Sequence, residues 1–262
     1  MADPNAVKLY NNAATNGANK RMAEILCGGV IVEVTTAKQA KTAELAGARC
    51  ISVFDSPKLG ISRMPDPFLV KEIMRAVKIP VMAKARVGHF VEAKILESTG
   101  VDFIDESEVL AIADEDHFIN KHNFRLPFVC GCHELGEALR RVEEGAAMIC
   151  IQGNMNGTGN IAETVCNTKE KGKLPVVHCA AGGISTPADA ALMMQLGCDG
   201  VFLGAEVFNS SHPHRRVRAI VQAVQNYNDP RMLKKLSSEL KNAMAETVGL
   251  DINEIRDDYF RA

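Results

Sequence analysis

The stretch D-P-F-L-V-K-E-I-M-R-A-V-K-I-P-V-M-A-K, residues 66–84, holds one complete unit of a pattern that runs through the chain. Asp66 is a typical helix N-cap and Pro67 suits the first helical position, so a helix is predicted to begin here. The run I-P-V-M-A-K that follows is apolar without alternation, which is typical of a strand buried on both faces. A helix followed by a buried strand is the repeating unit of an α/β protein.

The unit recurs along the chain. Eight β-rich runs are predicted as strands, at residues 29–34, 49–54, 79–84, 101–105, 127–131, 147–152, 175–179 and 200–204. Helical patterns lie between them, and T-P-A-D-A-A-L-M-M-Q-L-G, residues 186–197, repeats the combination of cap, proline and final glycine. Eight such units with short links favour a (β/α)₈ TIM barrel. The alternative is a doubly wound open sheet, which requires a dinucleotide fingerprint after the first strand, and T-T-A-K-Q-A is not one.

We therefore expect a single barrel domain over residues 1–262, with its core at about 20–228. The polar, Asn-rich residues 1–19 are predicted to be an N-terminal arm. Residues 229–262 are predicted to be a C-terminal tail with an extra helix over 231–248, which a barrel does not need and which would suit subunit contacts.

Composition excludes several classes of protein. The chain has 262 residues, 47% hydrophobic content and a net charge of −2, so nothing points to nucleic acid or to an anionic membrane surface. The start lacks the regions of a signal peptide, and no apolar run is long enough to span a bilayer. The eight cysteines lie mostly in apolar runs, which predicts reduced thiols in a cytoplasmic protein. The pair in C-G-C, residues 130–132, has the wrong spacing for zinc and would share one strand face, so no metal site is predicted.

The functional groups of a barrel lie at the C-terminal ends of its strands. Four polar residues end predicted strands: Glu33, Lys84, Asp105 and Gln152. A lysine in a pocket of low dielectric has a depressed pKa, which frees its amine to form a Schiff base with a carbonyl. A structural lysine paired with Glu33 or Asp105 is an equally good interpretation from the chemistry alone.

Three glycine-rich loops follow the last strands. They are G-N-M-N-G-T-G-N at residues 153–160, the pair Gly182-Gly183, and Gly204 with Ala205. Such loops present backbone N–H groups with no side chain in the way, and in barrels the loops after strands seven and eight commonly hold phosphate. Together the three loops predict a phosphorylated ligand.

Several long blocks resemble one known family, the synthase subunit of glutamine-dependent pyridoxal 5′-phosphate synthase. The similarity extends from about Lys20 to Glu246. The blocks are G-G-V-I-V-E-V, R-M-P-D-P, P-V-M-A-K-A-R-V-G-H, D-E-S-E-V, F-V-C-G-C, G-T-G-N-I and A-A-G-G-I-S-T-P-A-D-A-A-L-M-M-Q-L-G-C-D-G-V-F. The resemblance implies a barrel that assembles into hexamers and dodecamers. It also implies synthesis of pyridoxal 5′-phosphate from a pentose phosphate such as ribose 5-phosphate, a triose phosphate and ammonia from a glutaminase subunit.

The resemblance also assigns roles to residues. Lys84 matches the lysine that holds the pentose as a Schiff base, and Glu33 stands where the family has an assisting aspartate. Asp105, like Lys84, is assigned to the first half of the reaction, in which the pentose is captured. The glycines that match residues lining phosphate sites are Gly157, Gly183 and Gly204. No cofactor is implied, because pyridoxal 5′-phosphate is the family's product.

The chain departs from the family at four positions in or near the expected site. Gln152 replaces a second catalytic lysine, and an amide cannot form an imine. Cys150 replaces an arginine, Glu33 carries its carboxylate one methylene further out, and Ala205 replaces a serine that donates to phosphate. In addition, the segment after the second strand is short, and the link from Asn160 to Leu174 lacks a helical insertion of the family.

These losses fall mainly on the second half of the reaction. They predict a subunit that is impaired in catalysis and supports active paralogous subunits by joining their rings, with the glutaminase subunit as a further partner. The alternative is an active synthase that forms a Schiff base through Lys84. It would need another amine for the transfer step, and Lys169 is the nearest candidate in the sequence.

Overall fold

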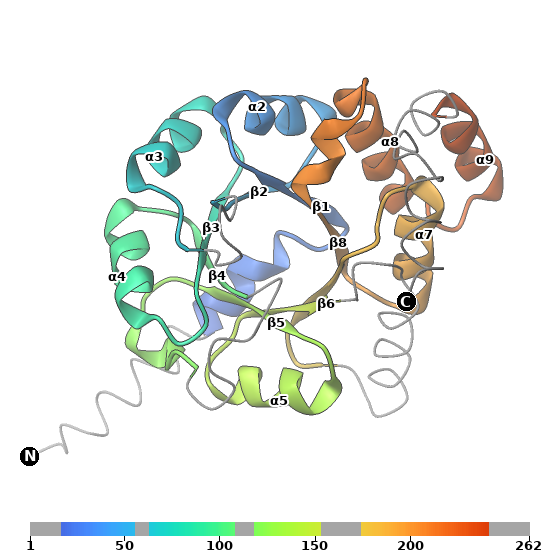
Figure 1. Cartoon of the computed structure of the whole chain (residues 1–262). Helices are drawn as coiled ribbons and strands as arrows, with labels where there is room; N and C mark the ends of the chain where they lie inside the picture. The colour runs from blue at the N-terminus through green and yellow to red at the C-terminus, as the bar shows by residue number, and fades with distance from the viewer. Residues whose placement is uncertain (1–16, 56–62, 108–117, 153–173, 241–262) are drawn as a thin grey trace, which may run out of the picture.

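The computed structural model describes residues 17–55, 63–107, 118–152 and 174–240. Eight parallel strands form a closed barrel in the order β1 to β8, which confirms the predicted (β/α)₈ fold (Figure 1). The strands are β1 Gly29–Val34, β2 Cys50–Val53, β3 Val81–Ala85, β4 Phe103–Glu106, β5 Phe128–Cys132, β6 Met148–Gln152, β7 Val177–Ala181 and β8 Gly200–Leu203. The closure is the pairing of β1 with β8, in which Gly29 lies opposite Gly200.

Helices surround the barrel on its outer side (Figure 1). Their bounds are α2 Ala37–Ala46, α3 Pro67–Ala76, α4 Phe90–Thr99, α5 Leu135–Glu143, α7 Pro187–Leu196, α8 Pro213–Gln225 and α9 Pro230–Glu239, with short 3₁₀ turns η1 Lys121–Asn123 and η2 Ala205–Asn209. The extra C-terminal helix predicted from the sequence is α9, which packs on α7 and α8. The part of the predicted helix beyond residue 240 lies outside the described residues.

Local sequence sets where the helices begin and end. The Asp66 side chain accepts a hydrogen bond from Phe68 N (2.8 Å), and Pro67 follows as the first residue of α3. Thr186 and Asp189 form a capping box at the start of α7, which ends at Gly197 with a φ of 109°. These caps satisfy N–H groups that a helix start otherwise leaves without partners.

Two apolar layers hold the barrel together. One lies between strands and helices, and it includes both Cys130 and Cys132, as expected for two cysteines on one strand face. The other lies inside the barrel, with Ile31, Met82 and Phe103 among its members. The period-2 alternation of strand side chains separates these two layers.

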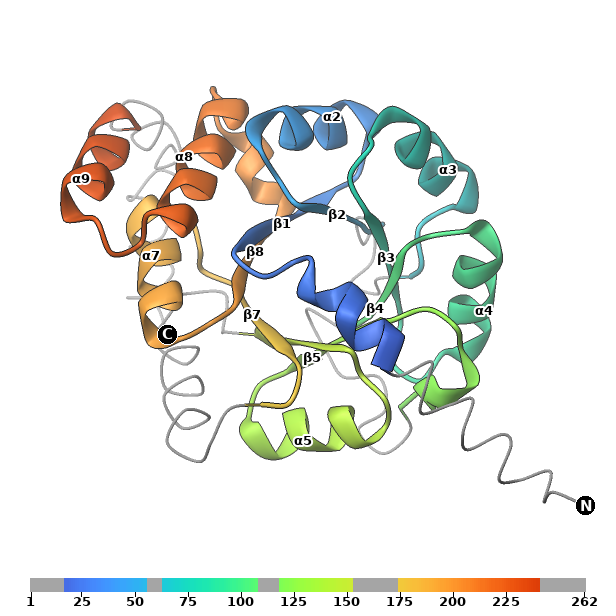
Figure 2. The same cartoon turned by 180° about the vertical axis from the view of Figure 1, so that it is seen from behind.

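A helix over residues 17–24 lies across the opening of the barrel at the N-terminal ends of the strands (Figure 2). Its buried Ala23 packs with the interior residues of the barrel, and so does Leu26 just after the helix. The predicted boundary between arm and core at residue 19 therefore falls inside a helix. Apolar contact with the barrel interior gives this segment a role that its polar composition did not predict. Within the described residues, no helix has the length and apolar character that crossing a lipid bilayer requires.

Candidate active site at the C-terminal end of the barrel

Lys84 is the penultimate residue of β3 and points into the barrel, where it is only 3% exposed. Its Nζ atom donates a hydrogen bond to Glu33 Oε1 (3.2 Å). It also lies 5.9 Å from the centre of the Phe54 ring. Glu33 belongs to β1, which is separated from β3 by β2, so the two side chains meet across the interior of the barrel. The structure thus brings together two of the predicted site residues.

The charge state of Lys84 differs from the expectation. Burial lowers the pKa of the Lys84 ammonium, but the negative charges of Glu33 and Asp105 outweigh burial, and the net pKa lies above its ordinary value. The predicted depression of the Lys84 pKa is therefore wrong. The physical reason is that an ammonium within hydrogen-bonding distance of a carboxylate gains more from the charge pair than it loses by leaving water. Lys84 must give up a proton before it can attack a carbonyl.

Asp105 is the third member of the group. It pairs with Lys84 in the β3–β4 register and is 1% exposed. Burial raises the pKa of the Asp105 carboxyl to about 6, although the neighbouring Lys84 opposes the shift. Its Oδ1 atom has no hydrogen-bond partner among the described residues. A buried oxygen without a partner is costly, so this atom is available to a ligand hydroxyl group.

Strand β6 carries the two predicted departures. Cys150 faces the interior and is buried, and burial raises the pKa of its thiol well above its usual range, so the side chain is neutral. Gln152 is the last residue of β6. Its side chain lies against the backbone of Gly131 in β5. A Cβ atom built on Gly131 would be 2.8 Å from Gln152 Oε1 and 2.8 Å from Ser107 Cβ. Gln152 therefore reaches over β5 toward β4, the strand that carries Asp105.

The predicted phosphate-binding turns after β7 and β8 lie at one end of the barrel. Gly182 and Gly183 follow β7 with φ angles of 92° and 65°, a conformation that favours glycine. Gly204 follows β8 and Ala205 begins η2, so both lie at the same end as the first turn. The arrangement agrees with the expected position of a phosphate-binding rim.

Two other predicted substrate-binding residues, Gly157 and Lys169, belong to the link between β6 and β7. Both fall in the segment 153–173, which lies outside the described residues. The contact of Gly157 with phosphate and the contribution of Lys169 to the site therefore stay predictions.

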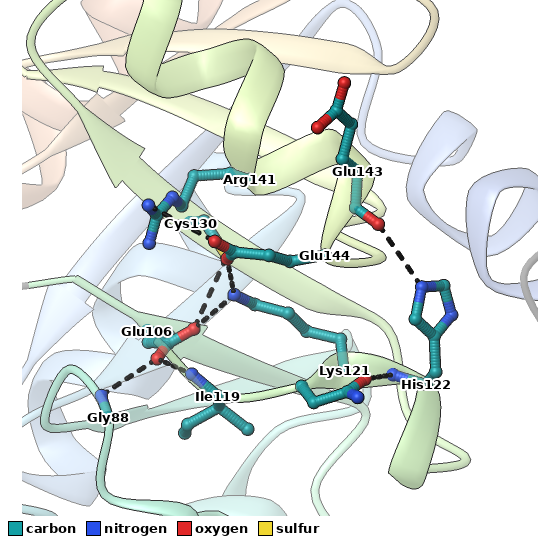
Figure 3. Close-up of polar contacts among 10 residues, drawn as sticks. Gly88, Glu106, Ile119, Lys121, His122, Cys130, Arg141, Glu143 and Glu144 are labelled. Carbon is teal, nitrogen blue, oxygen red and sulfur yellow. Dashed lines mark hydrogen bonds and ion pairs between the residues drawn. The ribbon is translucent and has the colours of Figure 1, made fainter. Parts of the chain in front are cut away.

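A buried polar cluster supports the site from outside the barrel (Figure 3). Glu106 follows Asp105 in β4 but faces outward. Its Oε1 atom accepts hydrogen bonds from Gly88 N (3.0 Å) and Ile119 N (2.8 Å). Its Oε2 atom pairs with Lys121 Nζ at 2.7 Å. One carboxylate thereby holds the chain after β3, the strand of Lys84, against the chain that returns after β4.

Sequence reasoning missed Glu106 and also Ser52. The Ser52 hydroxyl is fully buried on the β2 position opposite Glu33, and it has no hydrogen-bond partner among the described residues. The only available signal was a serine in an otherwise apolar strand, C-I-S-V-F. Among the described residues, no group of His, Cys, Asp and Glu side chains is arranged to hold a metal ion.

Comparison with known proteins identifies the family. The sequence profile of the SOR/SNZ family matches residues 15–174. The chain belongs to the SOR/SNZ family. A second profile, that of the thiazole biosynthesis protein ThiG, matches residues 124–246 of this SOR/SNZ chain.

Named relatives agree with this membership. The pyridoxal 5′-phosphate synthase-like subunit PDX1.2 of Arabidopsis thaliana is 52% identical, and the match covers 97% of the SOR/SNZ chain and 95% of the relative. The pyridoxal 5′-phosphate synthase subunit PDX1.3 of the same plant is 49% identical, with 99% and 98% covered. The first match runs over 300 residues, more than the 262 of this chain, so that relative contains residues with no counterpart here. The family resemblance drawn from the sequence is confirmed.

A solved structure shares the fold of the SOR/SNZ chain. Thiamine phosphate pyrophosphorylase from Pyrococcus furiosus superposes with a TM-score of 0.57, covering 79% of this chain and 99% of that one. The two sequences are 14% identical, so this likeness concerns the fold alone.

Proposed function

We propose that the chain is a subunit of the pyridoxal 5′-phosphate synthase system that captures a sugar phosphate on Lys84 but does not complete the reaction. The observation that carries this proposal is the contrast between two strands. Strand β3 presents a buried amine beside two carboxylates, whereas β6 ends in the amide of Gln152. Relatives named as synthase subunits supply the reaction class.

The first half of the reaction has the groups that it needs. Glu33 Oε1 accepts the hydrogen bond of Lys84 Nζ, so it is placed to take the proton that converts the ammonium to the amine. The amine then adds to the aldehyde carbon of the sugar to form a carbinolamine. Loss of water, with a proton returned to the leaving oxygen by Asp105 or Glu33, gives the imine. Asp105 suits this acid–base role because its pKa is about 6.

The second half lacks its acceptor. Transfer of the intermediate in the family requires an amine on the sixth strand, and Gln152 has none. Cys150 is neutral and so does not replace the fixed positive charge of an arginine. The buried lysines among the described residues are Lys84 and Lys121, and Lys121 is paired with Glu106 and Glu144 in the cluster outside the barrel. These features support an impaired subunit that contributes structure to rings of active paralogous subunits.

An active synthase is the second candidate, and one observation favours it. Relatives about half identical to this chain are named as synthase subunits without qualification. That function would require an amine from the segment 153–173, where Lys169 lies, outside the described residues.

Two measurements on the full chain test the proposal. Ribose 5-phosphate followed by borohydride reduction should add the mass of one reduced sugar phosphate to the intact protein, and peptide mapping should place it on Lys84. Incubation with ribose 5-phosphate, a triose phosphate and ammonium should form no pyridoxal 5′-phosphate above the level of a Lys84→Arg control. Trapping at another lysine, or turnover like that of an active relative, would contradict the proposal.

A further inference from the structure

Glu206 lies beside the glycine turns at the C-terminal end of the barrel. It follows Gly204 by two residues, in the first turn of η2, and its side chain folds back over the backbone of Gly204. A Cβ atom built on Gly204 would lie 2.6 Å from Glu206 Cδ, a distance far inside van der Waals contact. The Glu206 carboxylate therefore occupies the space that the side chain of any non-glycine residue at position 204 would need.

This position matters because barrels commonly bind phosphate at the loops after their seventh and eighth strands. Here those loops are the turn at Gly182 and Gly183, and the end of β8 at Gly204. A phosphate monoester carries a charge of about −1.5 to −2 at neutral pH. Even at the weak limit of bulk water, a unit charge at about 4 Å repels such a group enough to lower its affinity about tenfold.

A buried cation near Glu206 is shared between carboxylates. Arg216 of α8 is 6% exposed, and its Nε atom donates to the Ser185 carbonyl oxygen (3.1 Å). Burial lowers the pKa of the Arg216 guanidinium, and the charges of Glu206 and Asp189 oppose that shift. Arg216 thus already balances two carboxylates, so a phosphate placed here would compete with Glu206 for the same cation.

We infer that Glu206 determines specificity at this end of the site by lowering the affinity for the phosphate group of the sugar. The site then discriminates little between a phosphorylated and a neutral pentose. This inference rests on the proposed function, in which Lys84 captures a sugar aldehyde.

The test compares the full-length chain with Glu206→Gln and Glu206→Gly. Gln removes the charge and keeps the volume, whereas Gly removes both. Glu72→Gln, at an exposed position of α3, is the matched control for loss of one surface carboxylate. One readout is the dissociation constant of inorganic phosphate measured by calorimetry. The other is the half-saturating concentration for borohydride trapping on Lys84, measured with ribose 5-phosphate and with ribose.

We expect phosphate to bind about tenfold more tightly to Glu206→Gln than to the original chain and at least as tightly to Glu206→Gly. Half-saturation by ribose 5-phosphate should fall by a similar factor, while that by ribose stays constant. Equal phosphate affinities in all four proteins would overturn the inference. Trapping of neither sugar in any protein would overturn the proposed function instead, and the phosphate affinities would still decide the role of Glu206.

Discussion

Lys84 shows how strongly the neighbours of one residue control its chemistry. The same buried ammonium would have a depressed pKa in an apolar pocket, yet here Glu33 and Asp105 raise it. The amine is therefore stored in its protonated form, hydrogen-bonded to the group that can remove the proton. A substrate that separates Lys84 from Glu33, or that shields one of the two carboxylates, would release the nucleophile.

The raised pKa of Asp105 predicts a signature in the pH dependence of stability. An aspartate in an unfolded chain has a pKa of about 3.9, whereas the pKa of Asp105 in the folded chain is about 6. Between these values the folded state binds more protons than the unfolded state, so the contribution of Asp105 falls as pH rises from about 4 to 6. The loss amounts to about 3 kcal/mol at most and persists at higher pH.

Asp105→Asn should remove that contribution. Relative to the original chain, the variant should gain about 2–3 kcal/mol of unfolding free energy between pH 4 and pH 7. Urea unfolding of both proteins across this range measures the difference, in which groups common to both proteins cancel. If the unfolding free energies of the two proteins instead change in parallel with pH, the pKa of Asp105 in the folded state is not raised.

At the scale of elements, Glu106 of β4 joins two other segments of the chain, one at Gly88 and one at residues 119–121. It holds the backbone at Gly88 and Ile119 and pairs with the buried Lys121. Asp105 and Glu106 are consecutive, so β4 directs one carboxylate to the site and the next to the support behind it. The loops at this end of the barrel are thereby linked to the strand that carries the acid.

Glu106→Gln tests this support. The substitution leaves Lys121 with Glu144 as its remaining carboxylate partner and weakens the acceptor for two backbone N–H groups. We expect a loss of about 3 kcal/mol in unfolding free energy, as for other broken buried ion pairs. Glu72→Gln on exposed α3 is the control and should change stability by less than about 0.5 kcal/mol. Similar denaturation midpoints for the two variants would show that the cluster does not stabilise the barrel.

The closure of the barrel depends on a glycine in β8. A Cβ atom on Gly200 would lie 2.8 Å from the Gly29 carbonyl oxygen and 2.9 Å from Cys179 Sγ. Gly200→Ala should therefore cost about 1–3 kcal/mol, since strand backbone cannot move aside cheaply. Gly136→Ala in α5 is the matched control, because the nearest atom there is 3.5 Å away and alanine favours a helix by about 1 kcal/mol. Thermal unfolding should move in opposite directions for the two variants.

At the scale of the whole molecule, the barrel is preserved although its site is altered. All eight strands close into one sheet, and α9 adds a small apolar contact with α8 outside the barrel. The departures inferred from the family resemblance, at positions 33, 150, 152 and 205, concern single side chains and leave the strands in place. The proposed supporting role requires a closed barrel, and the described residues form one.

Co-expression with an active synthase paralogue should therefore yield mixed rings. Native mass spectrometry would detect them as assemblies with masses between those of the two pure oligomers. The chain expressed alone is the control for self-assembly. Exclusively pure assemblies of the paralogue, with this chain in a separate fraction, would contradict a supporting role.

Much of this architecture could be predicted from the sequence because it depends on local patterns. Apolar runs indicated the strands, and Asp66 and Thr186 indicated the helix starts. The replacement of a lysine by Gln152 was inferred from the family resemblance. The helix over 17–24 was not predicted, because a polar composition does not reveal that one face packs beneath the barrel.

Only the tertiary structure decided which groups meet and what charge they carry. Glu33 and Lys84 are 51 positions apart and lie on strands that do not pair, so their contact depends on closure of the barrel. The direction of the Lys84 pKa shift then depends on the balance between burial and two nearby carboxylates. The fold of Glu206 over Gly204 likewise depends on side-chain geometry. Patterns of residue type report on local conformation, whereas electrostatics depends on distances that exist only after the chain has folded.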